Sequence, residues 1–301
     1  VRTVNDNTTL RTKHFNSDFS DDFKDAVVED PTPVITINGW FGDLFRFEKA
    51  GLFGQLTDSL AYKLSSEDAR DVWEAELTGG PNTDCDTCVN YNFSDLVEYY
   101  WPALITGVEY YSNQPQAEVI TVSSSCPVTL KSLEKYQNGK DNAGYVFNQQ
   151  TGLYELQDLS ANPLKTFIGL ACTGAFNGES PFIDYMNENG QNAINYYTSH
   201  GITHFGLSDL MLRLEVPLGW TFLVYGQSFL TNSNYKISLD LLKDFKSFIN
   251  DTSDIQPGVN VSLTNALILH GNLTNTLLSN LLGVDLSEND LVVPIEDAQG
   301  M

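Results

Sequence analysis

Side chains that can act as nucleophiles gather at one point of the chain. Three serines and a cysteine occupy positions 123–126, directly after the β-branched segment 119–122, and Pro127 follows them. Proline suits the first turn of a helix, where its missing N–H costs no hydrogen bond, so these side chains stand between a strand and a helix. A serine there needs a neighbouring base to attack an acyl group, and a thiol there has its pKa lowered by the helix dipole. Residues 123–126 therefore offer acyl transfer by a serine or thiol chemistry at Cys126.

The cysteines and the glycosylation sequons indicate an extracellular protein. Cys85 and Cys88 form a Cys-x-x-Cys pair, whereas Cys126 and Cys172 stand alone. The pair could be half of a zinc site or a redox pair, but no second pair and no nearby His complete four ligands, so we predict no metal. In an oxidising compartment one or two disulfides are favoured over a reactive thiol. The sequons that indicate N-glycosylation begin at Asn7, Asn92, Asn250, Asn260 and Asn272.

Composition excludes several classes of function. The 301 residues include 39 acidic and 16 basic side chains, a formal net charge of −23. Such a charge excludes nucleic-acid binding and opposes binding to anionic membranes, because both partners require Lys and Arg. Surface carboxylates could bind calcium, but the sequence has no EF-hand loop. No apolar run reaches the ~18 residues of a transmembrane segment. We expect a globular, extracellular domain without a cofactor.

Short apolar segments alternate with helical patterns along the chain. The segments expected to be strands cover 34–37, 72–77, 119–122, 166–171, 219–226 and 265–271. Residues spaced three and four apart predict helices between them, one of which Ser94 would cap. This alternation predicts an α/β fold with a mostly parallel central sheet and helices on both faces. Residues 1–33 would form an N-terminal arm, and 34–301 the main domain. Within that domain we expect a loop or small insertion at 138–151 and a helical cap at about 178–260.

Four segments carry short motifs in a fixed order. They are Val34–Gly42 (VITINGWFG), Ser123–Pro127 (SSSCP), Thr166–Met186 and Glu288–Glu296 (ENDLVVPIE). Together they resemble the α/β-hydrolase fold and, within it, the secreted bacterial and fungal triacylglycerol lipases. The lipases carry His-Gly-x-x-Gly at the first segment and Gly-x-Ser-x-Gly at the second. The latter is the nucleophile elbow, a sharp turn that exposes a serine at the end of a strand. The resemblance implies a site for an ester or lipid ligand.

The resemblance assigns a role to each aligned residue. In register with the family, Ser125 is the nucleophile and Asp290 is the acid of the catalytic triad. The oxyanion hole, which holds the negatively charged oxygen of the reaction, would consist of the Trp40 and Cys126 N–H groups. These assignments imply carboxylic-ester hydrolysis through an acyl-enzyme.

The same resemblance implies a disulfide pairing. In this fold the strand that carries the nucleophile lies beside the next parallel strand, so Cys126 and Cys172 would come within the range of a disulfide. Cys85 and Cys88 would then form the second disulfide, within one loop.

The sequence departs from the lipase pattern at the catalytic residues. Asn38 stands where the lipases have His, and Ser123 and Pro127 replace the two glycines of the elbow. In the family the triad His follows the acid, but no His follows Asp290 in this chain. The chain's four histidines are His14, His200, His204 and His270. His270 ends a predicted strand at the correct edge of the sheet but precedes the acid.

Three functions follow from these patterns. The first is lipase- or esterase-like hydrolysis, with the base supplied from outside this chain, as by a C-terminal continuation, or by His270. The second is a hydrolase-like domain without catalysis that has a structural or binding role among other extracellular chains. The third is carbohydrate binding by exposed aromatic residues, for which the candidates are Tyr99, Tyr100, Trp101, Tyr110 and Tyr111.

Overall fold

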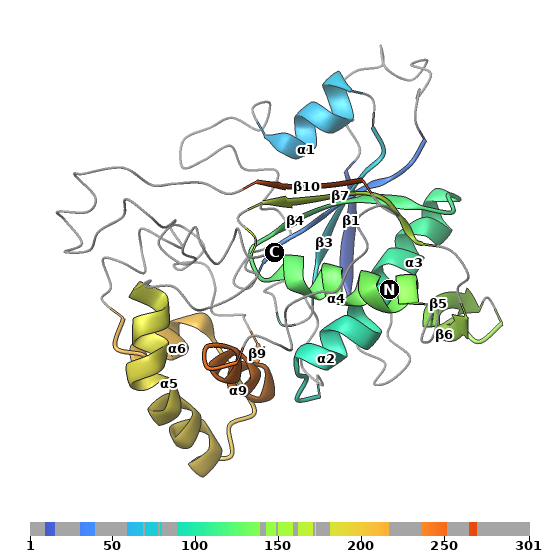
Figure 1. The fold of residues 1–301 in the computed structure, drawn as a ribbon. Helices are drawn as coiled ribbons and strands as arrows, with labels where there is room; N and C mark the ends of the chain where they lie inside the picture. Colours follow the sequence, from blue (N-terminus) through green and yellow to red (C-terminus); the bar gives the residue numbers. More distant parts are fainter. Residues whose placement is uncertain are drawn as a thin grey trace, which may run out of the picture.

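A six-stranded sheet forms the centre of the molecule (Figure 1). The computed structural model describes residues 10–15, 31–39, 59–68, 70–77, 79, 89–138, 143–148, 150–158, 162–170, 172, 181–216, 236–251 and 265–269. The strands lie in the order β1-β3-β2-β4-β7-β10. Their bounds are Arg11–Phe15 for β1, Val34–Ile37 for β2, Val72–Glu76 for β3, Ala117–Val122 for β4, Leu164–Leu170 for β7 and Asn265–Leu269 for β10.

All the pairings in this sheet are parallel except that of β1 with β3. Val34–Ile37 is buried along its whole length, as expected for a parallel strand that is covered on both faces. The predicted α/β fold with a mostly parallel sheet is therefore confirmed. The predicted strand at 219–226 lies outside the described residues.

Helices cover both faces of the sheet. Side chains of a strand alternate between its faces, so Ile35 and Phe167 join the core on the side of α3 (Trp101–Ser112) and α4 (Ser125–Asn138). On the other face, Val34, Val72 and Ile120 pack with Ala61 of α1 (Leu60–Tyr62), which continues into the π-helical η4 (Lys63–Glu67). Figure 1 shows α1 on one side of the sheet and α3 and α4 on the other.

The helix that we expected Ser94 to cap begins earlier. Asn92 is the N-cap of α2 (Phe93–Asp95): its side chain accepts the Asp95 N–H, and the Asp95 side chain accepts the Asn92 N–H. This reciprocal capping box satisfies two otherwise unpaired donors, an arrangement that Ser94 cannot match because it lies inside the first turn.

A π-helical turn precedes the proline of the next helix. Pro102 has no N–H to donate to a residue four positions earlier. Directly before it, the Trp101 N–H bonds to Leu96 O at the wider spacing of η5 (Leu96–Tyr100), after which α3 continues without a break in the chain direction. Pro102 thus marks a change of helix type.

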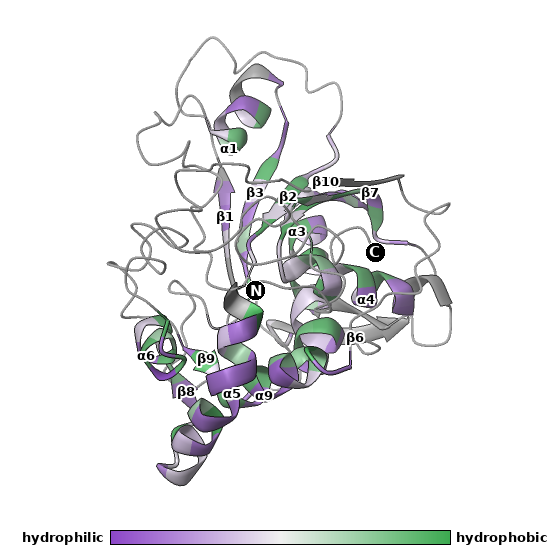
Figure 2. Cartoon of the chain, turned by 60° about the vertical axis from the view of Figure 1, so that its left-hand side comes forward, coloured by the Kyte–Doolittle hydropathy of each residue, from purple (hydrophilic) through white to green (hydrophobic). Residues whose placement is uncertain are grey.

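A strand within residues 10–15 and a hairpin within residues 143–158 were not expected from the sequence. β1 lies within the predicted N-terminal arm and forms the edge of the sheet, where Figure 2 shows its mainly hydrophilic residues. The expected loop at 138–151 contributes β5 (Ala143–Asn148) to an antiparallel hairpin with β6 (Leu153–Asp158). Glycine and asparagine mark turns as often as they mark loops, so composition did not separate the two.

A second apolar cluster forms the helical cap. Within it α5 (Pro181–Ser199), α6 (Leu207–Arg213) and α9 (Leu239–Phe248) pack together, and β8 (His204–Phe205) pairs with β9 (Ile237–Ser238). No helix in the described ranges is long and apolar enough to cross a membrane.

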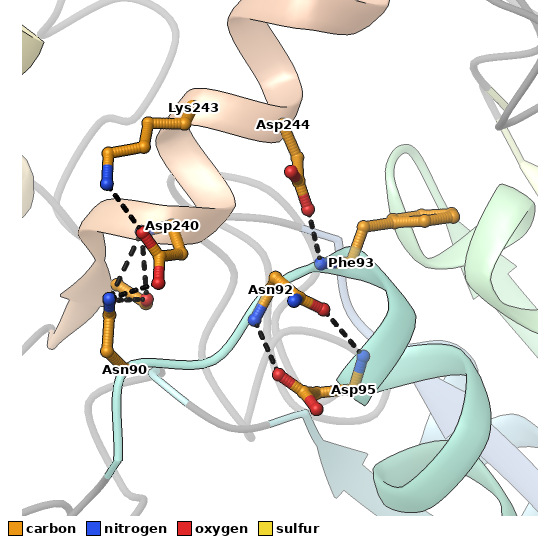
Figure 3. Close-up of polar contacts among 8 residues, drawn as sticks. Asn90, Asn92, Phe93, Asp95, Asp240, Lys243 and Asp244 are labelled. Carbon is orange, nitrogen blue, oxygen red and sulfur yellow. Dashed lines mark hydrogen bonds and ion pairs between the residues drawn. The ribbon is translucent and has the colours of Figure 1, made fainter.

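Polar contacts join the cap to the segment that leads into α2 (Figure 3). Asn90 is hydrogen-bonded to the Asp240 carboxylate and accepts the Ser238 hydroxyl at 2.6 Å. The Asp244 carboxylate accepts the Phe93 N–H at 2.8 Å. Because these bonds connect α9 to the residues at the start of α2, they hold the cap against the main domain.

Gly79 lies at a second junction between the cap and the main domain. Its O accepts the Lys236 N–H at 3.1 Å, and Tyr91 OH donates to Lys236 O at 3.2 Å. Gly79 has a φ of +89°, and a Cβ there would lie 1.9 Å from the Tyr91 hydroxyl. Only glycine fits both the conformation and the space.

Gly79→Ala should therefore destabilise the protein, because it combines backbone strain with overpacking, by about 2–4 kcal/mol. Gly152→Ala is the matched control, since Gly152 also has positive φ (+69°) but no atom lies near its Cβ position. The control should lose about 1 kcal/mol, from strain alone. Urea unfolding followed by tryptophan fluorescence measures both, and equal losses would contradict the steric role of Tyr91.

Candidate active site

The candidate site lies where β2 and β4 end. Ile37 pairs with Thr121 in parallel register, so the residues that follow both strands meet at one edge of the sheet. Ser123 and Ser124 alone connect β4 to α4. Ser123 has a φ of +56°, a left-handed conformation that costs a non-glycine residue about 1–2 kcal/mol. Strain of this kind concentrates at functional sites.

Backbone hydrogen bonds hold Ser123 in this conformation. Its N–H donates to Leu170 O at 3.0 Å, and its O accepts the Cys126 N–H at 3.0 Å. The first bond ties the turn to β7, and the second closes the turn into α4. Within the described part of the chain the Ser123 hydroxyl itself makes no hydrogen bond, and the residue is partly exposed.

The loop after β2 packs directly against Ser123. A Cβ on Gly39 would lie 2.7 Å from Ser123 Cβ, 2.6 Å from Val122 O and 3.3 Å from Ser124 N. Any larger residue would force the two loops apart, so glycine is required at position 39 for this close approach. Asn38, where the lipases have His, is buried.

Ser125 and Cys126 do not have the positions that the resemblance assigned to them. Ser125 is buried (1% exposed), and its hydroxyl lies 2.8 Å from Val122 O and 3.1 Å from Ile37 O. The Cys126 N–H, assigned to the oxyanion hole, is bonded to Ser123 O. The Ser125 hydroxyl and the Cys126 N–H are thus both already hydrogen-bonded. The strained turn lies at Ser123, two residues before the predicted nucleophile Ser125. The sequence alone does not distinguish these positions, because three serines follow one another.

The three histidines in the described ranges are bonded to residues other than Ser123. His14 Nε2 lies 2.6 Å from Asp71 Oδ1, His200 Nδ1 lies 2.8 Å from Tyr196 O, and His204 Nε2 lies 2.9 Å from Val89 O. His270, Asp290 and Trp40 lie outside the described residues. No group of three or more metal-ligating side chains occurs in the part of the chain that the structure describes.

The carboxyl groups with shifted pKa values lie at the opposite edge. Burial raises the pKa of Glu109, in the last turn of α3, to about 8. Burial opposes ionisation of Asp71, but hydrogen bonds from His14 and Trp73 outweigh it and hold its pKa below the usual value. Asp71 precedes β3, and the end of α3 precedes β4, so both lie at the amino ends of the strands.

Two of the five aromatic residues proposed for carbohydrate binding are exposed. Tyr110 and Tyr111 are 39% and 58% exposed, whereas Tyr100 and Trp101 are fully buried. Tyr99 packs against the core. The exposed pair therefore offers only a small aromatic surface, at the end of α3.

The predicted disulfide between Cys126 and Cys172 is present. Their Cα atoms lie 5.4 Å apart, and both residues are buried. Cys172 follows β7, so the bond connects the start of α4 to the strand next to β4. Cys85 and Cys88 lie outside the described residues.

Two of the five sequons fall on described residues. Asn250 is exposed at the end of α9, where its side chain donates to Lys246 O. Asn92 is half-buried, and its side-chain oxygen caps α2. The other three, at Asn7, Asn260 and Asn272, lie outside the described residues.

Comparisons with known proteins add a general structural likeness. No family model matches the sequence, and no curated protein matches it. A hydrolase from Oleispira antarctica has 12% identity, covers 98% of this chain and 82% of its own, and gives a TM-score of 0.44. A thermophilic esterase from Thermogutta terrifontis has 11% identity, with coverages of 97% and 79% and a TM-score of 0.47. A Bacillus licheniformis lipase has 12% identity, with coverages of 89% and 78% and a TM-score of 0.43.

Removing the disulfide should destabilise the protein without abolishing the fold. The bond closes a segment with a sequence separation of 46 residues, and the loss of such a bond costs about 2–5 kcal/mol. Cys126→Ala/Cys172→Ala should lower the midpoint of urea unfolding accordingly. An unchanged midpoint, or alkylation of both thiols in the unreduced native protein, would contradict this bond.

Proposed function

We propose that the chain is a carboxylic-ester hydrolase in which Ser123 is the nucleophile. The observation that supports this proposal is the left-handed Ser123 at the end of a parallel strand, directly before a helix and against Gly39. A nucleophile elbow has this arrangement of strand, strained serine and helix. The α4 N-terminus behind the turn would also stabilise negative charge near the serine.

The sequence fits the elbow when it is read two residues earlier. Thr121-Val122-Ser123-Ser124-Ser125 then occupies Gly-x-Ser-x-Gly, with small hydroxyl residues in place of both glycines. By position, the oxyanion donors are the Ser124 N–H, which follows the nucleophile, and the Trp40 N–H, which follows Gly39. This reading replaces Ser125 and Cys126 and keeps Trp40.

The proposed mechanism also requires a base, which can come from two sources. Ser123 would attack an ester carbonyl while a His accepts its proton, and the acyl-enzyme would then be hydrolysed by water. His270 is one source of this base, because it directly follows β10 in the chain and β10 runs parallel to β7. A His from outside this chain, oriented by Asp290, is the other.

One observation favours the alternative of a hydrolase-like domain without catalysis. None of the three described histidines contacts Ser123, and each is bonded elsewhere. In that case the same edge would bind an ester or lipid ligand, or another extracellular chain, without turning it over. Secretion and glycosylation, which the sequons and cysteines support, apply to both proposals.

We expect the Ser123→Ala and Ser125→Ala variants to differ strongly in an esterase assay. With a short-chain p-nitrophenyl ester, Ser123→Ala should lower kcat/KM by at least about 1,000-fold, because no nucleophile remains. Ser125→Ala should retain measurable turnover. Labelling by a fluorophosphonate, followed by peptide mass spectrometry, identifies the reactive serine directly.

His270→Ala separates the sources of the base. It should reduce turnover as strongly as Ser123→Ala if His270 accepts the proton, and leave it unchanged if the base comes from elsewhere. Equal, low background in the unchanged chain and in Ser123→Ala would refute the hydrolase proposal and support the non-catalytic domain.

Glycosylation is testable at Asn250. Because this asparagine is exposed, we expect it to carry an N-glycan when the chain passes through a eukaryotic secretory pathway. Asn250→Gln and Thr252→Ala, which removes the same sequon but keeps the asparagine, should each lower the intact mass by one glycan. Unmodified peptide 247–253 from the unchanged chain would contradict this expectation.

A further inference from the structure

Ser125 connects the ends of two strands through one hydroxyl group. Its Oγ lies 2.8 Å from Val122 O and 3.1 Å from Ile37 O, both of which can accept its proton. The same oxygen accepts the Val122 N–H at 3.1 Å. Val122 is the last residue of β4, and Ile37 is the last residue of β2.

The proposed nucleophile turn and Gly39 follow these two strand ends. Ser123 and Ser124 follow β4, and Gly39 lies two residues after the end of β2, packed against Ser123. The position of the Ser123–Ser124 turn relative to Gly39 therefore depends on how the ends of β2 and β4 are held together. Catalytic groups must be held within about 0.5 Å of their productive geometry.

We propose that Ser125 is a positioning residue that holds the Ser123–Ser124 turn against the end of β2. This role rests on the proposed function of Ser123. Ser125 does not touch the ligand, since it is 1% exposed beneath the turn. It takes the place of the second glycine of the elbow, which has no side chain, and its hydroxyl connects two strands that glycine would leave joined only by the backbone ladder.

The neighbouring residue extends the same connection to a third strand. Cys126 is bonded to Cys172, which follows β7, and its Sγ lies 3.2 Å from the Thr121 hydroxyl. The disulfide fixes α4 against β4 and β7 but does not reach β2. Among the side chains at the start of α4 in the described ranges, only that of Ser125 has a hydrogen bond to β2.

Loss of the Ser125 hydroxyl should act on the rate rather than on binding. Oxyanion contacts strengthen as the reaction approaches its transition state, so a misplaced donor lowers kcat and leaves KM nearly unchanged. We expect Ser125→Ala to reduce kcat about tenfold, with a change in KM of less than about twofold.

Ser132→Ala is the matched control. Ser132 is also 1% exposed and lies in the same helix, and its hydroxyl donates to Val97 O at 2.7 Å, away from the site. Ser132→Ala loses one buried hydrogen bond from serine to backbone, whereas Ser125→Ala loses both a donated and an accepted one, so Ser125→Ala should lower the melting temperature somewhat more. Only Ser125→Ala should lower kcat and the rate of fluorophosphonate labelling.

Amide hydrogen exchange tests the connection without relying on activity. Peptides covering 34–39 and 119–126 should exchange faster in Ser125→Ala than in Ser132→Ala, while β7 stays equally protected in both. Equal exchange and equal kcat in the two variants would overturn the proposal. If the unchanged chain shows neither turnover nor labelling, the proposed function fails and the catalytic role of Ser125 with it. The exchange data then show separately whether the strand connection exists.

Discussion

Only Ser123 and Ser124 connect β4 to α4, and this short connection forces Ser123 into a left-handed conformation. A helix that must start within two residues of a strand has no room for a gradual change of direction, so one residue takes the strain. Every other feature of the edge follows from this turn. Leu170 O accepts the Ser123 N–H, and α4 begins directly behind the serine. Position 39 must be glycine, because only a residue without a side chain lets the β2 loop lie against Ser123.

The two edges of the sheet have different chemical characters. At the carboxyl edge, Ser123 stands in a turn whose neighbours are satisfied by backbone bonds and a disulfide. At the amino edge, His14, Asp71 and Trp73 form a bonded and stacked group, and Glu109 is held largely neutral by burial. The described carboxyl groups with shifted pKa values thus lie at the edge opposite the candidate nucleophile. These two carboxyl groups therefore give no guide to this site, whereas backbone strain does.

Most of the sheet could be predicted from the sequence, because β-branched segments such as Val34–Ile37 alternate with helical patterns in a way that few folds accommodate. β1 could not, because a polar edge strand such as Arg11–Phe15 lacks the hydrophobicity of a buried one. The position of the nucleophile could not either. Three consecutive serines fit the small-residue pattern in more than one register, and only the φ of Ser123 distinguishes them.

The turn at Ser123 packs closely against its neighbours although it has no glycine at either glycine position of the elbow. Thr121 and Ser125 occupy the glycine positions, and both hydroxyls are turned inward, onto Cys126 Sγ and onto the ends of β2 and β4. Glycines on neighbouring segments, rather than within the turn, leave the space that close packing requires. Gly39 admits the β2 loop, and Gly169, whose Cβ would lie 2.3 Å from Cys172 Sγ, admits the disulfide. Close approach is a property of pairs of surfaces, so a glycine on either surface can satisfy it. Side chains on the elbow then become free to connect the strands, which a strict Gly-x-Ser-x-Gly turn cannot do.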